Sequence, residues 1–520
     1  MKGVAEPAIA PDGRSVAFAV TTTDLPAIRR QTNLWRVDAD GKGARALTLS
    51  DKRDASPAFS PDGTVLAFLS TRAGDPQVFF LPTGGGEAEK KTDVPGGVGG
   101  FLFTPDGKRL LVTAEVWPEC GADAACNRKK DEAMEKGKMK AYVADRFFVR
   151  HWDSWEDGKR THVLVVDLAD AKALLRDLTP GDFDSPAFVV GGGGDFDVSP
   201  DGKELVFTSN RDAQPATSTN SDLWVVPIDG SPEALASPRN ITASNRAFDG
   251  APRYSPDGRS IGYTMQRVPG YESDRSVLAL YDRTSGTSHV LTEGLDNWVK
   301  AFRFAPDGKR LYFTADVKGR TPLHSLDLAT GKISVVSNVD SPSGRKIQVL
   351  LVTDAFRGDA QVYPGAGKVM QDVAAVSDWL AAQPWVDKDR NSSTEELWFP
   401  EWDLGGTPWQ NPEGYRKQSP SSYVRQFKTP TLVVTGQKDF RVPYTQSLSF
   451  FTDLQKMGVP SRLVVFENSS HWPGWYDMVL YYAAHLDWFH TYLGGAPSPW
   501  NPKALARNAV FGEKDEKAKP

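Results

Sequence analysis

The stretch Ser60-Pro61-Asp62-Gly63-Thr64-Val65-Leu66-Ala67-Phe68-Leu69 decides the fold, because its pattern returns along most of the chain. Proline sets φ at the start of a tight turn, aspartate bonds its own backbone and glycine accepts a positive φ, so the chain reverses direction. The apolar residues that follow predict a β-strand. The same small residue followed by Pro-Asp-Gly occurs with proline at 11, 61, 105, 200, 256 and 306.

The spacing of these turns predicts a β-propeller. The intervals are 50, 44, 95, 56 and 50 residues, and we interpret the long one as two periods with a degenerate copy near residues 143–168. Each unit also contains a second strand of the type Leu34-Trp35-Arg36-Val37. This period, with four short strands per unit, is typical of propeller blades. We therefore predict a seven-bladed N-terminal propeller, because ordinary hairpin turns in another all-β fold would not keep a register over about 300 residues.

The composition excludes several classes of protein. The 61 basic and 66 acidic residues give a net charge of −5, which does not favour a nucleic-acid partner. No apolar run reaches the length that crosses a membrane. The amino terminus, Met1-Lys2-Gly3-Val4, lacks the apolar core of a signal peptide. We expect either a cytoplasmic protein or one whose leader has been removed.

The two cysteines, Cys120 and Cys126, lie six residues apart after the first long strand of the third predicted blade. A local disulfide would indicate an oxidising compartment and favour a periplasmic or secreted protein, whereas two free thiols would favour the cytoplasm. The residues alone leave both alternatives open. We expect no metal site here, because no pair of histidines lies nearby.

A second domain begins near residue 339, where the repeat stops. Helical periodicity then appears, with apolar residues on one face at Val369, Met370, Val373, Val376 and Leu380. We predict a multidomain β plus α/β protein with the propeller at 1–338, an α/β domain at 339–500 and a charged tail at 501–520.

An acid and a histidine follow two strands of this second domain. A strand at Thr431–Gly436, a helix and a strand at Arg462–Phe466 form a βαβ unit, which predicts parallel strands with a right-handed crossover. Asp439 and His471 come just after these strands, at the sheet edge where open α/β folds place their sites. Their order matches the last two members of an α/β-hydrolase triad. This predicts that Asp439 orients the imidazole and that His471 takes the proton of a serine.

Each member of the pair also has a structural alternative. Asp439 could cap the next helix, and His471 could be an exposed loop residue. His485 and His490, on the final helix, are less well placed substitutes for the histidine. The 32-residue separation on a βαβ frame favours the catalytic pair.

Several segments together resemble the prolyl oligopeptidase family of serine peptidases, whose members join a β-propeller to a C-terminal α/β-hydrolase domain. The segments that carry this resemblance are Gln383–Arg390, Trp398–Trp402, Gly405–Trp409 and the Asp439 and His471 motifs. In the propeller half, Cys120, Cys126 and Arg150-His151-Trp152-Asp153 resemble the dipeptidyl-peptidase 5 and acylaminoacyl-peptidase-like subgroup.

The resemblance implies a serine exopeptidase that hydrolyses short peptides near their amino terminus, releasing dipeptides or acylated amino acids. It implies that Trp398, Phe399, Trp402 and Trp409 line the pocket for the residue before the scissile bond, with packing at a domain interface as the alternative. It implies no metal or organic cofactor, and it allows a homodimer.

One part of the family pattern is missing, and the resemblance therefore implies a shortened α/β-hydrolase domain at 339–500. After Arg390, where the family continues into its Gly-x-Ser-x-Gly nucleophile elbow, the sequence reads Asn391-Ser392-Ser393, and we expect no such elbow anywhere in the chain. None of the seven histidines precedes a glycine, so the His-Gly-Gly loop of the oxyanion hole, expected between about Val349 and Val369, is missing too. Ser392, Ser393, Ser469 and Ser470 are poor substitutes, because a serine in a polar loop lacks a fixed aim at the histidine and the oxyanion donors.

Two interpretations of this gap remain. In the first, the sequence is an altered version of an active peptidase whose parent supplies the missing segments. In the second, it is an inactive relative whose propeller serves as a peptide- or protein-binding module. We favour the first, because Asp439, His471 and the aromatic segment retain family-like residues, and we expect no activity unless the missing segments are supplied. A TolB-like scaffold would explain the repeat but not Asp439 and His471.

Overall fold

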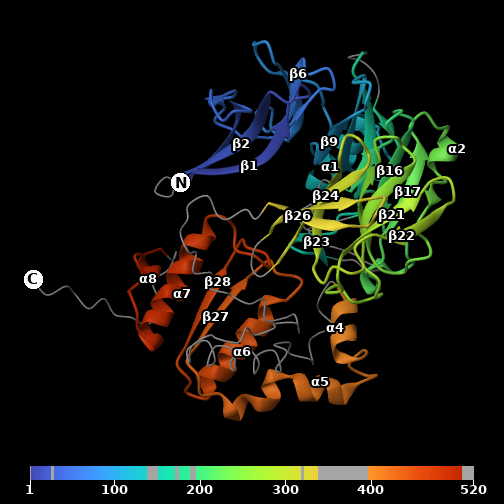
Figure 1. Cartoon of the computed structure of the whole chain (residues 1–520). Helices are drawn as coiled ribbons and strands as arrows, with labels where there is room; N and C mark the ends of the chain where they lie inside the picture. The colour runs from blue at the N-terminus through green and yellow to red at the C-terminus, as the bar shows by residue number, and fades with distance from the viewer. Residues whose placement is uncertain are drawn as a thin grey trace, which may run out of the picture. The chain divides into compact units, whose positions relative to one another are not determined.

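The computed structural model describes residues 2–24, 29–136, 150–169, 175–187, 195–317, 321–337 and 396–505. The chain forms two compact units, drawn in Figure 1. The first comprises residues 1–143 and 157–346, and the second comprises residues 144–156 and 347–520. The boundary predicted near residue 339 and the helix predicted over 369–380 lie outside the described residues.

The described part of the first unit contains six four-stranded antiparallel sheets. The first three are β1 (Lys2–Ile9), β2 (Ser15–Asp24), β3 (Arg29–Asp38) and β4 (Arg45–Ala46); β5 (Asp54–Phe59), β6 (Val65–Ser70), β7 (Gln77–Pro82) and β8 (Glu89–Lys90); and β9 (Gly100–Phe103), β10 (Arg109–Val116), β13 (Arg160–Asp167) and β14 (Arg176–Asp177). The last three are β15 (Phe196–Val198), β16 (Glu204–Ser209), β17 (Asp222–Pro227) and β18 (Arg239–Asn240); β19 (Asp249–Tyr254), β20 (Ser260–Met265), β21 (Val277–Asp282) and β22 (Thr287–Val290); and β23 (Val299–Phe304), β24 (Arg310–Ala315), β25 (Leu323–Asp327) and β26 (Ile333–Ser337).

The prediction of seven blades is wrong, because the 95-residue interval holds one blade and an insertion. β10 pairs with β13 over eight residues, from Arg109↔Asp167 to Val116↔Arg160. β13 is therefore the third strand of the blade that β9 begins, and not part of a separate degenerate blade near residues 143–168. The insertion between β10 and β13 contains α1 (Ala124–Lys136) and the hairpin β11 (Arg150–His151) and β12 (Ser154–Trp155).

The Pro-Asp-Gly turns have the predicted geometry. Ser60 Oγ donates to Asp62 Oδ1 at 2.6 Å, and the Thr64 amide donates to the same oxygen at 3.0 Å. These hydrogen bonds, that from Ser60 above all, lower the pKa of Asp62. Gly63 has a φ of 72°, in the left-handed region that glycine adopts without a steric penalty. The turn that the sequence indicated therefore connects β5 to β6.

The core of the first unit lies between successive blades. Leu66 and Phe68 of the second blade pack with Ala17 and Leu34 of the first. Similar buried clusters join the second blade to the third and so on to the sixth. Among the described residues, no sheet combines strands from the two ends of the propeller half.

The predicted βαβ unit is confirmed in the second unit. β27 (Thr431–Gly436) and β28 (Ser461–Phe466) are parallel, in register from Thr431↔Ser461 to Gly436↔Phe466. α6 (Tyr444–Lys456) connects them and packs against both strands, as Figure 1 shows. Leu454 is buried there with Val433 and Phe427.

The other described helices of the second unit are α4 (Trp398–Leu404), α5 (Pro412–Gln418), the 3-10 helix η3 (Pro420–Gln426), α7 (Asp477–Leu493) and α8 (Pro502–Leu505). The first unit also has the 3-10 helix η1 (Pro215–Thr217) and the short helix α2 (Pro232–Leu235). Within the described parts of the chain, every helix falls short of the length and apolarity needed to cross a membrane. The hairpin β11–β12 belongs by its contacts to the second unit, although its sequence lies between two propeller strands.

Candidate active site

Two loops leave the carboxyl ends of the parallel strands and are tied to each other by their backbones. The Gln437 amide donates to the Phe466 carbonyl at 2.8 Å, and the Lys438 amide donates to the Ser469 carbonyl at 3.0 Å. The loop after β27 and the loop after β28 therefore run together, as expected for neighbouring parallel strands whose carboxyl ends share one edge.

Gly436 allows this close approach. A Cβ at this position would stand 2.8 Å from the carbonyl carbon of Ser469 and still closer to the carbonyl oxygens of Ser469 and Ser470. Real Cβ atoms essentially never come so close to backbone atoms. The absence of a side chain at Gly436 is thus what lets the second loop lie directly on the end of β27.

Asp439 and His471 meet where the two loops run together. The Asp439 Oδ2 atom lies 3.0 Å from His471 Nδ1, and Asp439 Oδ1 accepts the Val442 amide at 2.8 Å. The carboxylate is buried, whereas the His471 side chain is 25% exposed. Because Nδ1 faces the carboxylate, Nε2 is the nitrogen left to exchange a proton with a substrate or a nucleophile. The arrangement is that of an oriented general base.

The loop that carries His471 is fixed from its other side by the start of α7. Ser469 Oγ donates to Asp477 Oδ2 at 2.5 Å and accepts the Gly474 amide at 3.0 Å. The Ser469 side chain is therefore engaged in holding the loop. Ser392 and Ser393, the substitutes expected nearer the elbow position, lie outside the described residues.

The family models match both halves of the chain. Residues 379–496 match the prolyl oligopeptidase family, and residues 2–122 match the TolB β-propeller domain. The chain carries a prolyl oligopeptidase family domain. Asp439 and His471 both lie inside the part that matches this family.

Known relatives support the same assignment over most of the chain. Dipeptidyl-peptidase 5 of Porphyromonas gingivalis is 23% identical over 632 aligned positions, which cover 90% of this chain and 90% of the relative. Dipeptidyl-peptidase 5 of Aspergillus fumigatus is 25% identical over 97% of this chain and 67% of the relative. The crystal structure of acylaminoacyl peptidase from Pyrococcus horikoshii has the same fold, with a TM-score of 0.64, 13% identity and coverage of 97% of this chain and 98% of that one.

The alignment with the Porphyromonas protein is longer than this chain. It spans 632 positions, and the chain has 520 residues, so at least 112 aligned positions are gaps in this chain. The relative therefore contains segments for which this sequence has no counterpart.

The expectation that the sequence holds no Gly-x-Ser-x-Gly is wrong, because the pattern occurs once, at Gly258-Arg259-Ser260-Ile261-Gly262. It spans the turn from β19 to β20, and the Ser260 amide donates to Ser255 Oγ at 2.9 Å. A nucleophile elbow turns from a strand into a helix. Here the chain turns from strand to strand, so this copy is one of the Pro-Asp-Gly turns of the propeller half.

The aromatic residues predicted to line the family's pocket lie on and after α4. Trp398 is half-buried, whereas Trp402 is 47% and Trp409 is 77% exposed. The side chain of Phe399 lies outside what the structure describes. A pocket role for these four residues stays a prediction.

The two histidines of the last helix bond to backbone carbonyls. His485 Nδ1 donates to the Tyr481 carbonyl at 2.7 Å, and burial lowers the pKa of His485. His490 Nδ1 lies 2.8 Å from the Gly495 carbonyl. These contacts give both residues a structural role in α7.

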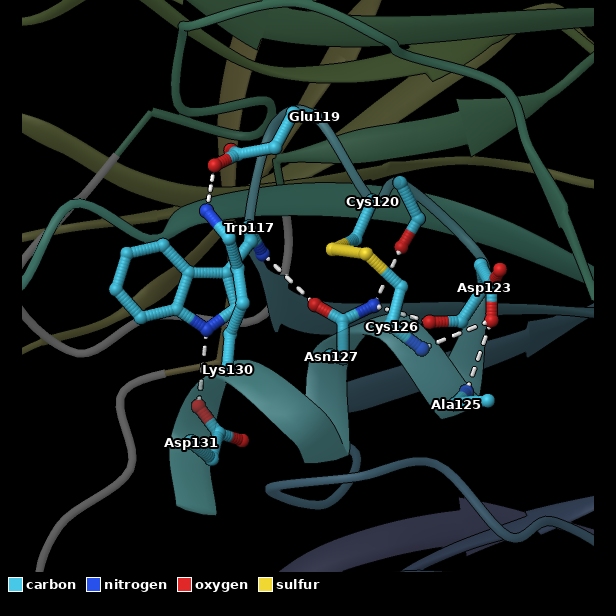
Figure 2. Close-up of a disulfide and its surroundings, with 10 residues drawn as sticks. Trp117, Glu119, Cys120, Asp123, Ala125, Cys126, Asn127, Lys130 and Asp131 are labelled. Atoms are coloured by element: carbon cyan, nitrogen blue, oxygen red, sulfur yellow. Dashed lines mark hydrogen bonds and ion pairs between the residues drawn. A yellow bond between two sulfur atoms is a disulfide. The ribbon is translucent and has the colours of Figure 1, made fainter. Parts of the chain in front are cut away.

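A disulfide joins Cys120 and Cys126, whose Cα atoms are 5.5 Å apart, at the start of α1 (Figure 2). Asp123 Oδ1 accepts the amides of Ala125 and Cys126 at 2.9 and 3.0 Å and so satisfies the first turn of the helix. Asn127 Oδ1 accepts the Trp117 amide at 2.9 Å, which ties the helix to the end of β10. Within the described residues, no cluster of three or more histidine, cysteine or acidic side chains could hold a metal ion.

Sequence reasoning did not identify two residues near the pair: Trp152, whose ring contacts His471, and Glu396, which binds Arg441 of the acid loop. Trp152 lies in the hairpin that the sequence puts inside the propeller half, and Glu396 lies just before α4. The Arg150–Asp153 motif was recognised by its resemblance to the subgroup, but no periodicity indicated which unit it joins. A long insertion between two paired strands was the one available signal.

Proposed function

We propose that this protein provides the acid and the base of a serine exopeptidase that acts on short peptides near their amino terminus. Asp439 orients and stabilises the imidazole, and His471 acts as the general base. The observation that carries the proposal is the 3.0 Å contact between Asp439 Oδ2 and His471 Nδ1 at the ends of two parallel strands.

The chemistry that the pair supports is acyl transfer. A serine Oγ attacks the scissile carbonyl carbon while its proton passes to His471 Nε2, and the Asp439 carboxylate stabilises the imidazolium that forms. His471 then gives the proton to the leaving amine as the C–N bond breaks. Water, deprotonated by His471, hydrolyses the resulting ester and restores the serine.

The substrate class rests on the relatives. Several curated relatives are named dipeptidyl-peptidase 5, and acylaminoacyl peptidases are among the similar solved structures. Both names indicate release of a short unit from the amino terminus of a peptide. We propose dipeptides or acylated amino acids as the products.

The nucleophile is the part of the triad that this sequence does not supply in its hydrolase half. The Gly-x-Ser-x-Gly pattern is confined to a propeller turn, and Ser469 is held by Asp477 and Gly474. We propose that catalysis needs a serine elbow and an oxyanion loop at the two places where the family has them. These places are between Val349 and Val369 and after Arg390.

The test is the parent gene read across these two places, followed by expression of its product. A fluorophosphonate probe should label that product at an elbow serine, and His471→Ala should abolish labelling and the cleavage of dipeptidyl or acylaminoacyl chromogenic substrates. The 520-residue chain itself should remain unlabelled. Labelling that persists in His471→Ala would refute the proposed base.

A gene that reads continuously across both places would favour the alternative, an inactive relative that binds peptides or proteins. The specific observation behind this alternative is the excess of at least 112 aligned positions over the chain's own 520 residues. That function predicts peptide binding to the folded chain without hydrolysis, measurable by calorimetry.

A further inference from the structure

The hairpin β11–β12 has a strained turn that is aimed at the acid loop. Its register pairs Arg150 with Trp155 and His151 with Ser154, which leaves Trp152 and Asp153 as the two turn residues. Trp152 has a φ of 53°, a left-handed conformation that is sterically unfavourable for a bulky residue. Such conformations persist where the surroundings impose them, and they concentrate at functional sites.

The backbone of this turn binds the residue that follows Asp439. The Phe440 amide donates to the Trp152 carbonyl at 3.0 Å. The hydrogen bond fixes the orientation of the peptide group between Asp439 and Phe440, directly after the carboxylate that contacts His471. The side chain of Phe440 is also contacted, because the Arg150 guanidinium lies 4.5 Å from the centre of the Phe440 ring.

The side chain of the turn residue reaches the histidine itself. The Trp152 and His471 rings are 6.2 Å apart at 85°, an edge-to-face arrangement. The guanidinium of Arg441, a residue of the acid loop, lies 5.1 Å from the centre of the same Trp152 ring. One tryptophan therefore contacts both loops of the pair, the acid loop through its carbonyl and the histidine loop through its ring.

A buried carboxylate provides a second link between the hairpin and the acid loop. Glu396 accepts a hydrogen bond from Arg441, and its Oε1 lies 3.4 Å from Nε2 of His151. Glu396 is almost fully buried, and the side chains of Arg441 and His151 are 12% and 17% exposed. The ion pair of Arg441 with Glu396 holds its geometry at this depth because separating the two groups would leave an uncompensated buried charge.

We infer that the hairpin Arg150–Trp155 is a positioning element for the Asp439–His471 pair, with Trp152 as its positioning residue. The inference rests on the proposed function for its catalytic meaning, but its physical content is the geometry of the pair. Trp152 restricts the rotation of the His471 ring to orientations in which Nδ1 faces Asp439. The hairpin, whose sequence lies inside the propeller half, thereby determines the direction in which Nε2 points.

The test uses Trp152→Gly, which keeps the left-handed turn and its carbonyl but removes the ring, and Trp152→Phe, which restores an aromatic edge. The readout is the exchange with water of the histidine Nδ1–H protons in protein labelled with 15N-histidine. Trp152→Gly should speed the exchange at His471 by roughly 2- to 10-fold, the factor that corresponds to one edge-to-face contact. Trp152→Phe should restore most of the protection.

Two references within the molecule separate positioning from stability. His485 donates to the Tyr481 carbonyl in the same unit, and His162 Nδ1 lies 2.7 Å from Asp177 Oδ2 in the propeller. Both should keep their exchange rates in Trp152→Gly. Trp500→Gly, which removes a tryptophan that is 45% exposed and has no predicted role in the site, should leave His471 unchanged.

Unchanged exchange at His471 in Trp152→Gly would overturn the inference, and so would equal acceleration at His471 and His485, because the hairpin would then only stabilise the unit. These measurements need no hydrolysis. If the proposed function is wrong, fluorophosphonate labelling will persist in His471→Ala, and this outcome is distinguishable from a failure of the present inference.

Discussion

Replacing Gly436 by alanine should disrupt the pair without touching either of its members. The Cβ of an alanine would stand 2.8 Å from the carbonyl carbon of Ser469, and closer still to two backbone carbonyl oxygens. The atoms that it meets belong to the backbone of the loop carrying His471, which cannot rotate away as a side chain could. The loop must move as a whole.

The size of the movement follows from these distances. The new Cβ needs an ordinary separation of about 3.4 Å from the Ser469 carbonyl carbon, and its still closer contacts with the two carbonyl oxygens must also be relieved. The backbone at Ser469 and Ser470 must therefore move by about 1 Å. This shift would lengthen the contact between Asp439 and His471, now 3.0 Å, beyond hydrogen-bond distance. We expect a loss of stability of about 1–3 kcal/mol, as for other insertions of a methyl group into packed structure.

The assay compares Gly436→Ala with Gly474→Ala in the same loop. A Cβ at Gly474 would meet nothing closer than 3.7 Å, so this control should keep both the stability and the pair. Urea unfolding gives the change in stability, and the Nδ1–H resonance of His471 reports the hydrogen bond. A Gly436→Ala protein with an unshifted His471 resonance and an unchanged urea midpoint would refute the close approach described for β27 and the second loop.

Two further variants, one single and one double, test the propeller half. Burial raises the pKa of Asp249 to about 8, so this carboxyl binds its proton more tightly in the folded state, and the stability that it contributes is lost as the pH rises from about 4 to about 8. Asp249→Asn should remove that loss, so that the variant gains stability relative to the unsubstituted protein at pH 9, by at most roughly 6 kcal/mol for a shift of about four pKa units. If the substitution changed the urea midpoint equally at pH 5 and at pH 9, this expectation would be contradicted. Cys120→Ser with Cys126→Ser should cost about 2 kcal/mol, because the disulfide closes a loop of sequence separation 6, and faster amide hydrogen exchange in α1 should report it; unchanged protection would show that the capping hydrogen bonds suffice.

Local signals in the sequence predicted most of the fold. The Pro-Asp-Gly turns and the alternating strands are short-range patterns, and β27, α6 and β28 follow from a change of periodicity within about 35 residues. The blade count failed because β10 and β13 pair across an insertion of more than forty residues, and pairing at that distance leaves no local pattern. The interval of 95 residues was compatible with either an insertion or an extra blade.

The residues of the candidate site also fall into those that local sequence patterns predict and those that long-range contacts bring together. Asp439 and His471 were predictable because each follows a strand, and parallel strands bring their carboxyl ends together. The contact of Trp152 with His471 joins residues more than 300 positions apart and depends on which unit the hairpin joins. The Gly-x-Ser-x-Gly pattern at 258–262 shows the converse, because a motif has chemical meaning only in its structural context, and here the context is a β-hairpin.

The tautomer of His471 tests the central claim most directly. A general base that is oriented by Asp439 must carry its proton on Nδ1 when neutral, which leaves the lone pair on Nε2. The 15N chemical shifts of the two ring nitrogens, measured above the pH at which the ring is charged and assigned with His471→Gln, distinguish the two forms. We expect Nδ1–H in the unsubstituted protein and a change towards Nε2–H in Asp439→Asn. A neutral ring protonated on Nε2 in the unsubstituted protein, or the same tautomer in the unsubstituted protein and in Asp439→Asn, would contradict the account.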